Sequence, residues 1–130
     1  MSEDAKHCGI ILLAHGSRDP LWSRPIEAVA QRMQLISPQT PVVCAYLEHS
    51  VPDLHAATHS LLQATLDTVR IVPMFLGVGK HVREDLPVLV AQLQSSHPQV
   101  RFMLQPPVSD DDRFLNAMCS IALESPWMSP

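Results

Sequence analysis

Residues 8–18 read Cys8-Gly9-Ile10-Ile11-Leu12-Leu13-Ala14-His15-Gly16-Ser17-Arg18. The first seven form a nearly continuous apolar run rather than an alternating one, which is typical of a parallel strand covered on both faces. Similar runs recur about every 30 residues, which is the length of one strand–helix unit. They predict three further strands, over residues 41–47, 69–76 and 100–104.

Each predicted strand is followed by apolar residues spaced three and four apart, the pattern of a helix with one core-facing stripe. We expect the segment Ser50-Val51-Pro52-Asp53 to supply a capping oxygen or a first-turn carboxylate for the second helix. Pro25 and Pro87 are expected to lie in the first turns of the first and third helices. The four stripes consist of Ile26, Val29, Ala30, Met33 and Ile36; Leu54, Ala57, Leu61 and Ala64; Leu86, Leu89, Val90 and Leu93; and Phe114, Ala117, Met118 and Ile121.

The predicted order of elements is therefore β-α-β-α-β-α-β-α, an α/β fold. Right-handed crossovers predict a four-stranded parallel sheet with helices on both faces. Because this pattern resembles one half of a flavodoxin-like sheet, we expect a single flavodoxin-like half-domain with the strand order 2-1-3-4. Residues 1–130 are expected to form one domain, with a core over about 8–124 and irregular ends. Ligands of such sheets bind at the carboxyl ends of the strands where the chain order reverses, here between the first and third strands.

Composition restricts the class of protein. Hydrophobic residues make up 46% of the chain and charged residues 17%, which argues against disorder. A formal net charge of −4 argues against a nucleic-acid partner. The apolar runs are too short to span a bilayer, and the N-terminus lacks the features of a signal peptide, so we expect a cytoplasmic protein. Three widely spaced cysteines, Cys8, Cys44 and Cys119, are expected to be reduced thiols in the core.

Two histidines follow predicted strands and carry the functional signal. His15 follows the first strand, His81 follows the third, and either Glu48 or His49 follows the second. Two imidazoles and a carboxylate can ligate a first-row divalent metal, and the same set can accept protons from a bound ligand. Each histidine taken singly also fits a structural or surface position, so the hypothesis depends on the three strand ends meeting.

Positive charge gathers near the same strand ends. Four of the nine basic residues, Arg18, Arg24, Lys80 and Arg83, come just after the two histidine-bearing strands. A local basic mouth on an acidic protein is suited to an anionic small molecule, although scattered solvated charges would give a similar pattern. Glycines in these segments leave space for a large ligand or simply make tight turns: Gly16, Gly77 and Gly79.

Other residues offer weaker alternatives. His55 and His59 are four apart on the second predicted helix, where they fit a solvated face better than an accessory metal site. Trp22 is expected to pack over the first loop rather than to stack on a ligand. The sequence has neither a P-loop nor a complete dinucleotide fingerprint, since the third glycine is missing after Gly77-Val78-Gly79.

Three segments together resemble the class II chelatases, and in particular the short, CbiX-like sirohydrochlorin cobaltochelatases. They are Leu13-Ala14-His15-Gly16-Ser17-Arg18, Ala45-Tyr46-Leu47-Glu48, and residues 73–87, from Pro73-Met74-Phe75-Leu76 to Asp85-Leu86-Pro87. The resemblance extends over roughly residues 8–124. It implies that residues 1–130 form a single chelatase domain that pairs as a homodimer to enclose a tetrapyrrole.

The resemblance also implies an activity: insertion of a divalent metal into sirohydrochlorin without ATP, during cobalamin biosynthesis. Cobalt is the first expectation, with Fe²⁺ or Ni²⁺ as alternatives, and the metal is a substrate rather than a permanently bound cofactor. His15, His81 and Glu48 match the catalytic and metal-binding residues of the family. From position, we expect the substrate to be bound by Ser17, Arg18, Arg24, Gly77, Gly79, Lys80 and Arg83.

Three alternatives remain open at this stage. The first is the iron reaction on the same substrate, as a ferrochelatase for sirohaem. The second is a non-catalytic carrier of a tetrapyrrole or metal, which would keep the pocket but not turn over. The third is a half-subunit that is active only beside a different partner chain.

Overall fold

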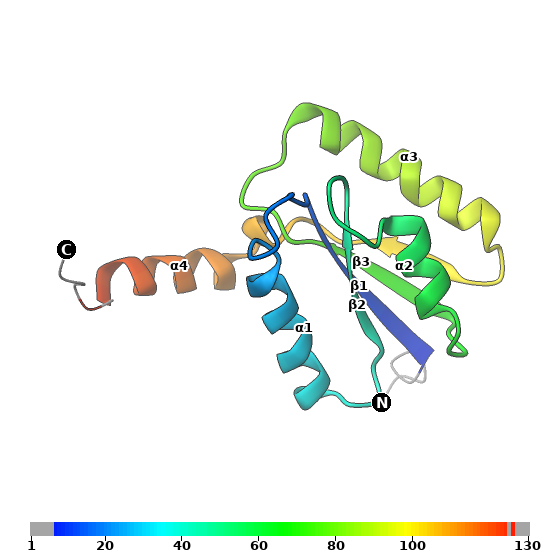
Figure 1. The fold of residues 1–130 in the computed structure, drawn as a ribbon, viewed down its shortest axis with the longest axis horizontal. Helices are drawn as coiled ribbons and strands as arrows, with labels where there is room; N and C mark the ends of the chain where they lie inside the picture. Colours follow the sequence, from blue (N-terminus) through cyan, green and yellow to red (C-terminus); the bar gives the residue numbers. More distant parts are fainter. Residues whose placement is uncertain (1–6, 125, 127–130) are drawn as a thin grey trace.

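The computed structural model describes residues 7–124 and residue 126. Its centre is a four-stranded parallel sheet in the order β2-β1-β3-β4, which confirms the predicted topology (Figure 1). The strands are β1 (Cys8–Ala14), β2 (Val42–Tyr46), β3 (Thr68–Pro73) and β4 (Arg101–Leu104). Around the sheet lie α1 (Arg24–Ile36), α2 (Leu54–Leu61), α3 (Lys80–Ser96), the short 3-10 helix η2 (Val108–Asp110) and α4 (Asp112–Glu124).

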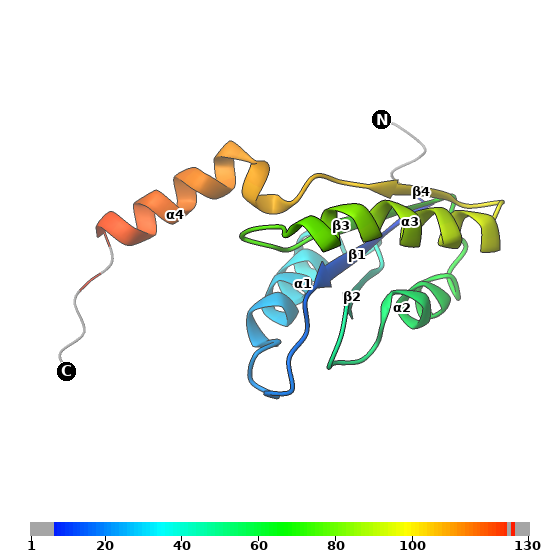
Figure 2. The same ribbon diagram turned by 90° about the horizontal axis from the view of Figure 1, so that it is seen from above.

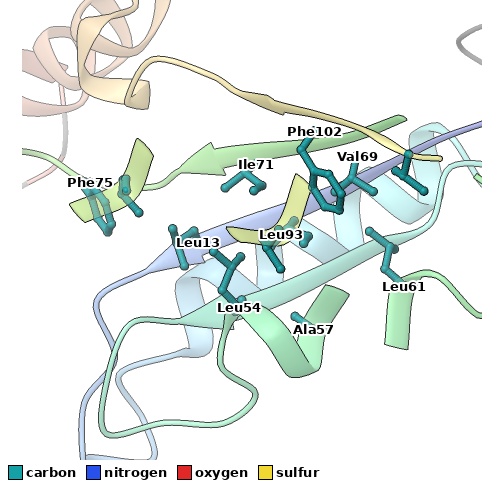
Figure 3. Packing of buried hydrophobic residues seen from close by; sticks show 13 residues of the cluster. Leu13, Leu54, Ala57, Leu61, Val69, Ile71, Phe75, Leu93 and Phe102 are labelled. Atoms are coloured by element: carbon teal, nitrogen blue, oxygen red, sulfur yellow. The ribbon is translucent and has the colours of Figure 1, made fainter. Parts of the chain in front are cut away.

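Alternate residues of each strand point to opposite faces of the sheet, so the core has two parts. The larger part lies between the sheet and helices α2 and α3, and contains Leu13, Ile71 and Leu93 (Figure 3). The smaller part lies under α1 and joins Leu12 of β1 to Ile26 of the helix. Helices therefore lie on both faces of the sheet, as the sequence predicts.

Helix starts follow the sequence in one case and depart from it in another. The carboxylate of Asp53 accepts a hydrogen bond from the backbone N–H of Ala56 at 2.8 Å, which confirms the predicted cap of α2. The placement of Pro87 in a first turn was wrong, because α3 begins at Lys80 and Pro87 lies inside the helix. Proline there has no N–H to donate, so the carbonyl of Arg83 lacks its helical partner.

The fourth helix forms where expected but does not pack as expected. Figures 1 and 2 both show α4 projecting away from the sheet, and no residue of α4 is buried. Met118 is 43% exposed and Ile121 61% exposed, so the prediction of a core-facing stripe was wrong for this helix. The segment that leads into it contains Pro106 and Pro107, and it carries α4 past the edge of the sheet rather than back over it.

The three cysteines differ in their burial. Cys8 is buried, Cys44 is half-buried, and burial raises the pKa of both thiols. Cys119 lies on α4 and is exposed, so the prediction of a core thiol was wrong at that position. Of the predicted irregular ends, residues 1–7 and 125–130, only His7 and Pro126 are among the described residues. Within residues 7–124, no helix combines the length and hydropathy needed to cross a bilayer.

Candidate active site

His15 is held beside the end of β3. Its ring lies 4.3 Å from the ring of Phe75, centroid to centroid, with an angle of 33° between the planes. Phe75 is only 2% exposed, so it is a fixed support, while His15 itself is exposed. The backbone N–H of Met74 donates to the carbonyl of Leu13 at 2.8 Å, which keeps the segment after β3 alongside β1. The imidazole is therefore oriented by the core but open to a ligand.

Gly16 allows the ends of β1 and β2 to meet. Its φ of +100° lies in the left-handed region, and a Cβ atom at this position would overlap the carbonyl oxygen of Glu48. The backbone N–H of Glu48 also donates to the carbonyl of His15 at 3.0 Å. The structure therefore brings His15 and Glu48 together through their backbones, at the position predicted from the sequence.

Two serines link the loop after β1 to the loop after β2. The backbone N–H of Ser17 donates to the Ser50 hydroxyl at 3.0 Å, and that hydroxyl donates to the Ser17 carbonyl at 2.8 Å. The Ser17 hydroxyl accepts from the N–H of Asp19 at 3.1 Å. Sequence analysis missed Ser50, because its partner is 33 positions away and no local pattern connects them.

His49 is the other candidate at the end of β2. It has a φ of +64°, a conformation that a residue other than glycine seldom adopts outside tight turns and functional sites. Its Nε2 lies 3.7 Å from Oε1 of Glu48, and both side chains are substantially exposed. The structure thus places an imidazole against the carboxylate of Glu48, and this imidazole belongs to His49.

A cavity of about 270 Å³ opens beside His15. Its lining combines the two strand ends with one face of α3: His15, Leu47, Glu48, Val82, Asp85, Leu86 and Leu89. Asp85 was not singled out from the sequence, although it stands one turn after His81. His81 lies in the first turn of α3 but is not among the lining residues. Across residues 7–124, no group of three or more His, Cys, Asp or Glu side chains is close enough to hold a metal ion.

The predicted basic mouth is divided between two helix starts. Lys80 and Arg83 lie in the first turn of α3, and Arg24 is the first residue of α1. Arg18 is exposed in the loop after β1. Arg83 has a structural contact, since its Nη1 donates to the carbonyl of Val78 at 2.9 Å. The N-terminus of a 17-residue helix adds partial positive charge at the same place.

The two glycines before α3 occupy open space. No atom lies within 4 Å of a Cβ built at Gly77 or Gly79, and neither has a left-handed φ. The backbone conformation therefore does not require glycine at either position. This differs from Gly16, where both the conformation and the close approach of Glu48 require it.

Two lesser candidates are placed as well. His55 and His59 are both exposed on α2, which agrees with the solvated face expected for residues that flank the core stripe of this helix. The ring of Trp22 lies 6.2 Å from that of Tyr46, edge to face, at the end of β2. Trp22 therefore packs against this end of the sheet, although it is still 39% exposed.

Comparison with known proteins identifies the family. Residues 9–125 match the family described as CbiX, and apart from Cys8 this range includes all four strands and the whole candidate site. The chain belongs to the CbiX family. The family match also extends through α4, so the projecting helix is part of the shared sequence pattern.

Two relatives match most of the chain. A sirohydrochlorin cobaltochelatase from Sulfolobus acidocaldarius is 24% identical over 110 residues, which is 85% of each chain. Another from Saccharolobus solfataricus is 27% identical over 99 residues, covering 73% of this chain and 72% of that one. In both cases the matched part makes up nearly the same share of the relative as of this chain.

Two solved structures share the fold. A cobalamin (vitamin B12) biosynthesis CbiX protein from Marinobacter aquaeolei VT8 superposes with a TM-score of 0.78 at 30% identity, over 90% of this chain and 95% of that one. The sirohydrochlorin chelatase SirB from Bacillus subtilis subspecies spizizenii, solved in complex with cobalt, has a TM-score of 0.77 at 18% identity. The match covers 92% of this chain but 51% of SirB, so this CbiX-family chain spans about half of SirB.

Proposed function

We propose that this chain is a sirohydrochlorin cobaltochelatase, which inserts a divalent metal into the tetrapyrrole without ATP during cobalamin biosynthesis. The observation that carries the proposal is that His15, whose imidazole is oriented by Phe75, and Glu48 line the same open cavity. The CbiX family and the names of the relatives supply the reaction. Cobalt is the first expectation for the metal, which is a substrate and not a resident cofactor.

The reaction needs a place to hold the metal briefly and a route for two protons. The metal ion replaces the two pyrrole protons of the macrocycle, so the ring gains M²⁺, two protons leave, and no oxidation is involved. A neutral imidazole has a lone pair that either ligates the incoming metal or accepts one of these protons. Glu48 supplies negative charge beside it. Open positions around the metal are an advantage here, because the ion must be released into the ring.

We assign His81 to the same reaction from its place on α3. It precedes the lining residue Asp85 by one helical turn, and residues four apart lie on the same side of a helix. A macrocycle seated over the strand ends would be bordered by His15 on one side and by this first turn on the other. His81 is then suited to take the second proton or to complete the metal's ligands.

The carboxylates of sirohydrochlorin explain the positive charge at the rim. We propose that Arg18, Arg24, Lys80 and Arg83 contact these carboxylates, aided by the N-terminus of α3. Arg83 can do so while it stabilises the loop through Val78. Ser17 borders the same corner, and the open space at Gly77 and Gly79 leaves room for the ring edge. A homodimer in the cytoplasm that binds no nucleic acid completes the proposal.

The test is anaerobic absorbance of purified protein with sirohydrochlorin and, in turn, Co²⁺, Fe²⁺ and Ni²⁺. Metalation should be faster than the uncatalysed background, and His15→Ala or His81→Ala should lower its rate by orders of magnitude with the fold intact. The matched control replaces His55 and His59 together by alanine, and this should leave the rate nearly unchanged. Binding without acceleration in the wild type would show a carrier instead, and loss of activity in the control would place the site on α2.

A further inference from the structure

Helix α4 carries an apolar stripe that is largely exposed in the part of the chain that the structure describes. Leu115, Met118 and Ile121 are 46%, 43% and 61% exposed, and they lie on one side of the helix at spacings of three. Asn116 lies on the opposite side. An isolated helix of 13 residues is only marginally stable in water, so α4 needs a packing partner to persist.

The sheet has a matching uncovered surface on the face that carries α1. On this face α1 packs over β1, β2 and the end of β3, and the buried cluster there includes no residue of β4. Register places Arg70 and Val72 of β3 and Arg101 and Met103 of β4 on it. A cavity of about 870 Å³ lies beside it, lined by residues that include Val72, Gln105 and Phe114. Parallel sheets of this class are normally covered on both faces, so this surface lacks a helix.

The segment between β4 and α4 keeps the helix from its own sheet. It contains Pro106 and Pro107, and Pro107 has the extended geometry of polyproline II, with φ of −55° and ψ of 147°. Figures 1 and 2 both show that this segment directs α4 beyond the strand ends. A stiff extended connection of this kind favours exchange of the helix between chains over folding back.

We propose that α4 is an exchanged arm: it crosses to a second copy of this chain and packs on that copy's uncovered β3–β4 face. Each copy has one exposed helix, α4, and one uncovered sheet surface, over β3 and β4. A two-fold pairing would therefore cover both. The lengths agree, since 13 helical residues and six strand residues each span about 20 Å. This deepens the proposed function, on which it rests for the expectation of a homodimer, by naming the surfaces that join the copies.

Charge at the far end of the arm fits the same arrangement. A helix that enters at the carboxyl ends of the strands and runs antiparallel to them ends near the start of β3 and β4. Its last residue, Glu124, then comes close to Arg70 and Arg101, which are both exposed on that face. The exchange also affects the site, because a cavity of about 560 Å³ already connects the first turns of α4 with Gly77 and Arg83.

The first test is sedimentation of the purified full chain over a range of concentrations, without substrate. We expect a dimer for the wild type. Ile121→Asp should weaken it by about two orders of magnitude, because it forces a charge into an apolar contact. Asn116→Asp adds the same charge on the opposite side of α4 and should leave the dimer intact. A monomeric wild type, or equal effects of the two variants, would overturn the proposal.

The second test distinguishes exchange from any other dimer. Met103→Glu should disrupt the receiving face, so that each single variant is monomeric. In a mixture of Met103→Glu with Ile121→Asp, the intact helix of the first finds the intact face of the second, so one of the two contacts is restored and part of the dimer should return. If circular dichroism shows that Met103→Glu is unfolded, Gln105→Arg takes its place. Gln105 is already polar, and a longer arginine side chain there would obstruct the packing of the helix on the same face. Two folded variants that remain monomeric when mixed would exclude the exchange.

Activity is measured separately, so the two proposals fail separately. Dimers that do not accelerate metalation would overturn the proposed function and leave the exchanged arm standing. A wild-type monomer with full metalation activity would overturn the exchange alone.

Discussion

The imidazole of His15 rests on the ring of Phe75, with 4.3 Å between the ring centroids. One member of this pair is exposed at the mouth of a cavity and the other is almost completely buried. The position of the functional side chain is therefore set by the core of the domain. This contact extends the buried cluster between the sheet and α3 out to the candidate site.

Phe75→Leu tests that connection. Leucine keeps the site apolar, so the free energy of unfolding should fall by only about 1 kcal/mol. Loss of the ring contact, worth about 0.5–1.5 kcal/mol, should lower the metalation rate by up to about tenfold. Phe102→Leu is a matched control, since Phe102 is also buried and its ring lies 6.0 Å from that of His97, on another part of the sheet. Similar rates for both variants would mean that Phe75 only fills space.

Gly16→Ala should be severe. The methyl group would need a left-handed backbone and would overlap the carbonyl oxygen of Glu48. We expect the free energy of unfolding to fall by about 3 kcal/mol or more, since strained backbone and overpacking each contribute 1–3 kcal/mol. Urea unfolding measures the change. A variant as stable as the wild type would show that the contact between His15 and Glu48 is easily rearranged.

Gly77→Ala should behave in the opposite way. Its added methyl group meets open space, and a Gly→Ala change in a compatible conformation stabilises by about 0.4–1 kcal/mol. If this space receives the tetrapyrrole, KM for sirohydrochlorin should rise severalfold while stability is kept. Thermal unfolding measures the effect on stability, and steady-state metalation measures KM. An unchanged KM would show that Gly77 does not border the bound tetrapyrrole.

Most of what can be predicted of the fold comes from the strand residues. β1 matches its predicted bounds because the apolar run and the strand end together at Ala14. The third strand ends at Pro73, three residues before the apolar run does. Met74 and Phe75 continue the run as packing residues after the sheet pairing stops, and hydrophobicity alone does not separate these two roles. The sheet order was predicted from the likeness of the pattern to one half of a flavodoxin-like sheet, and the structure has that order.

Contacts that depend on loops were harder to predict. An apolar stripe shows that a helix needs a partner but not which chain supplies it, and α4 is the example. Topology brings the carboxyl ends of β1 and β3 together; His15 directly follows β1, and His81 follows β3 after a loop. The distance between their side chains depends on the conformation of residues 76–79, which no periodic pattern encodes. The clamp between Ser17 and Ser50 is also a product of tertiary structure.

Alkaline pH should destabilise the domain. Burial raises the pKa of Cys8, Cys44 and Tyr46, so in the folded state these groups hold their protons to higher pH than in the unfolded state. Their contribution to stability is complete below the ordinary thiol pKa of about 9 and is lost as pH rises through the raised values. Urea unfolding between about pH 8 and 11 should show the decline. Cys44→Ala should make it shallower, and an identical slope in this variant would exclude the thiol as a source.

Ser50→Ala tests the clamp that holds the loop after His15. The change removes one hydrogen bond to the N–H of Ser17 and one to its carbonyl, and should lower the free energy of unfolding by about 1–2 kcal/mol. We expect the metalation rate, measured well below the melting temperature, to fall by about tenfold because His15 and Glu48 lose their fixed relation. Ser60→Ala, at an exposed position on α2, is the control. Ser50→Thr keeps the hydroxyl and should restore much of the rate. If Ser50→Ala loses stability but keeps its rate and pH profile, the clamp supports only the loop and has no part in positioning the site.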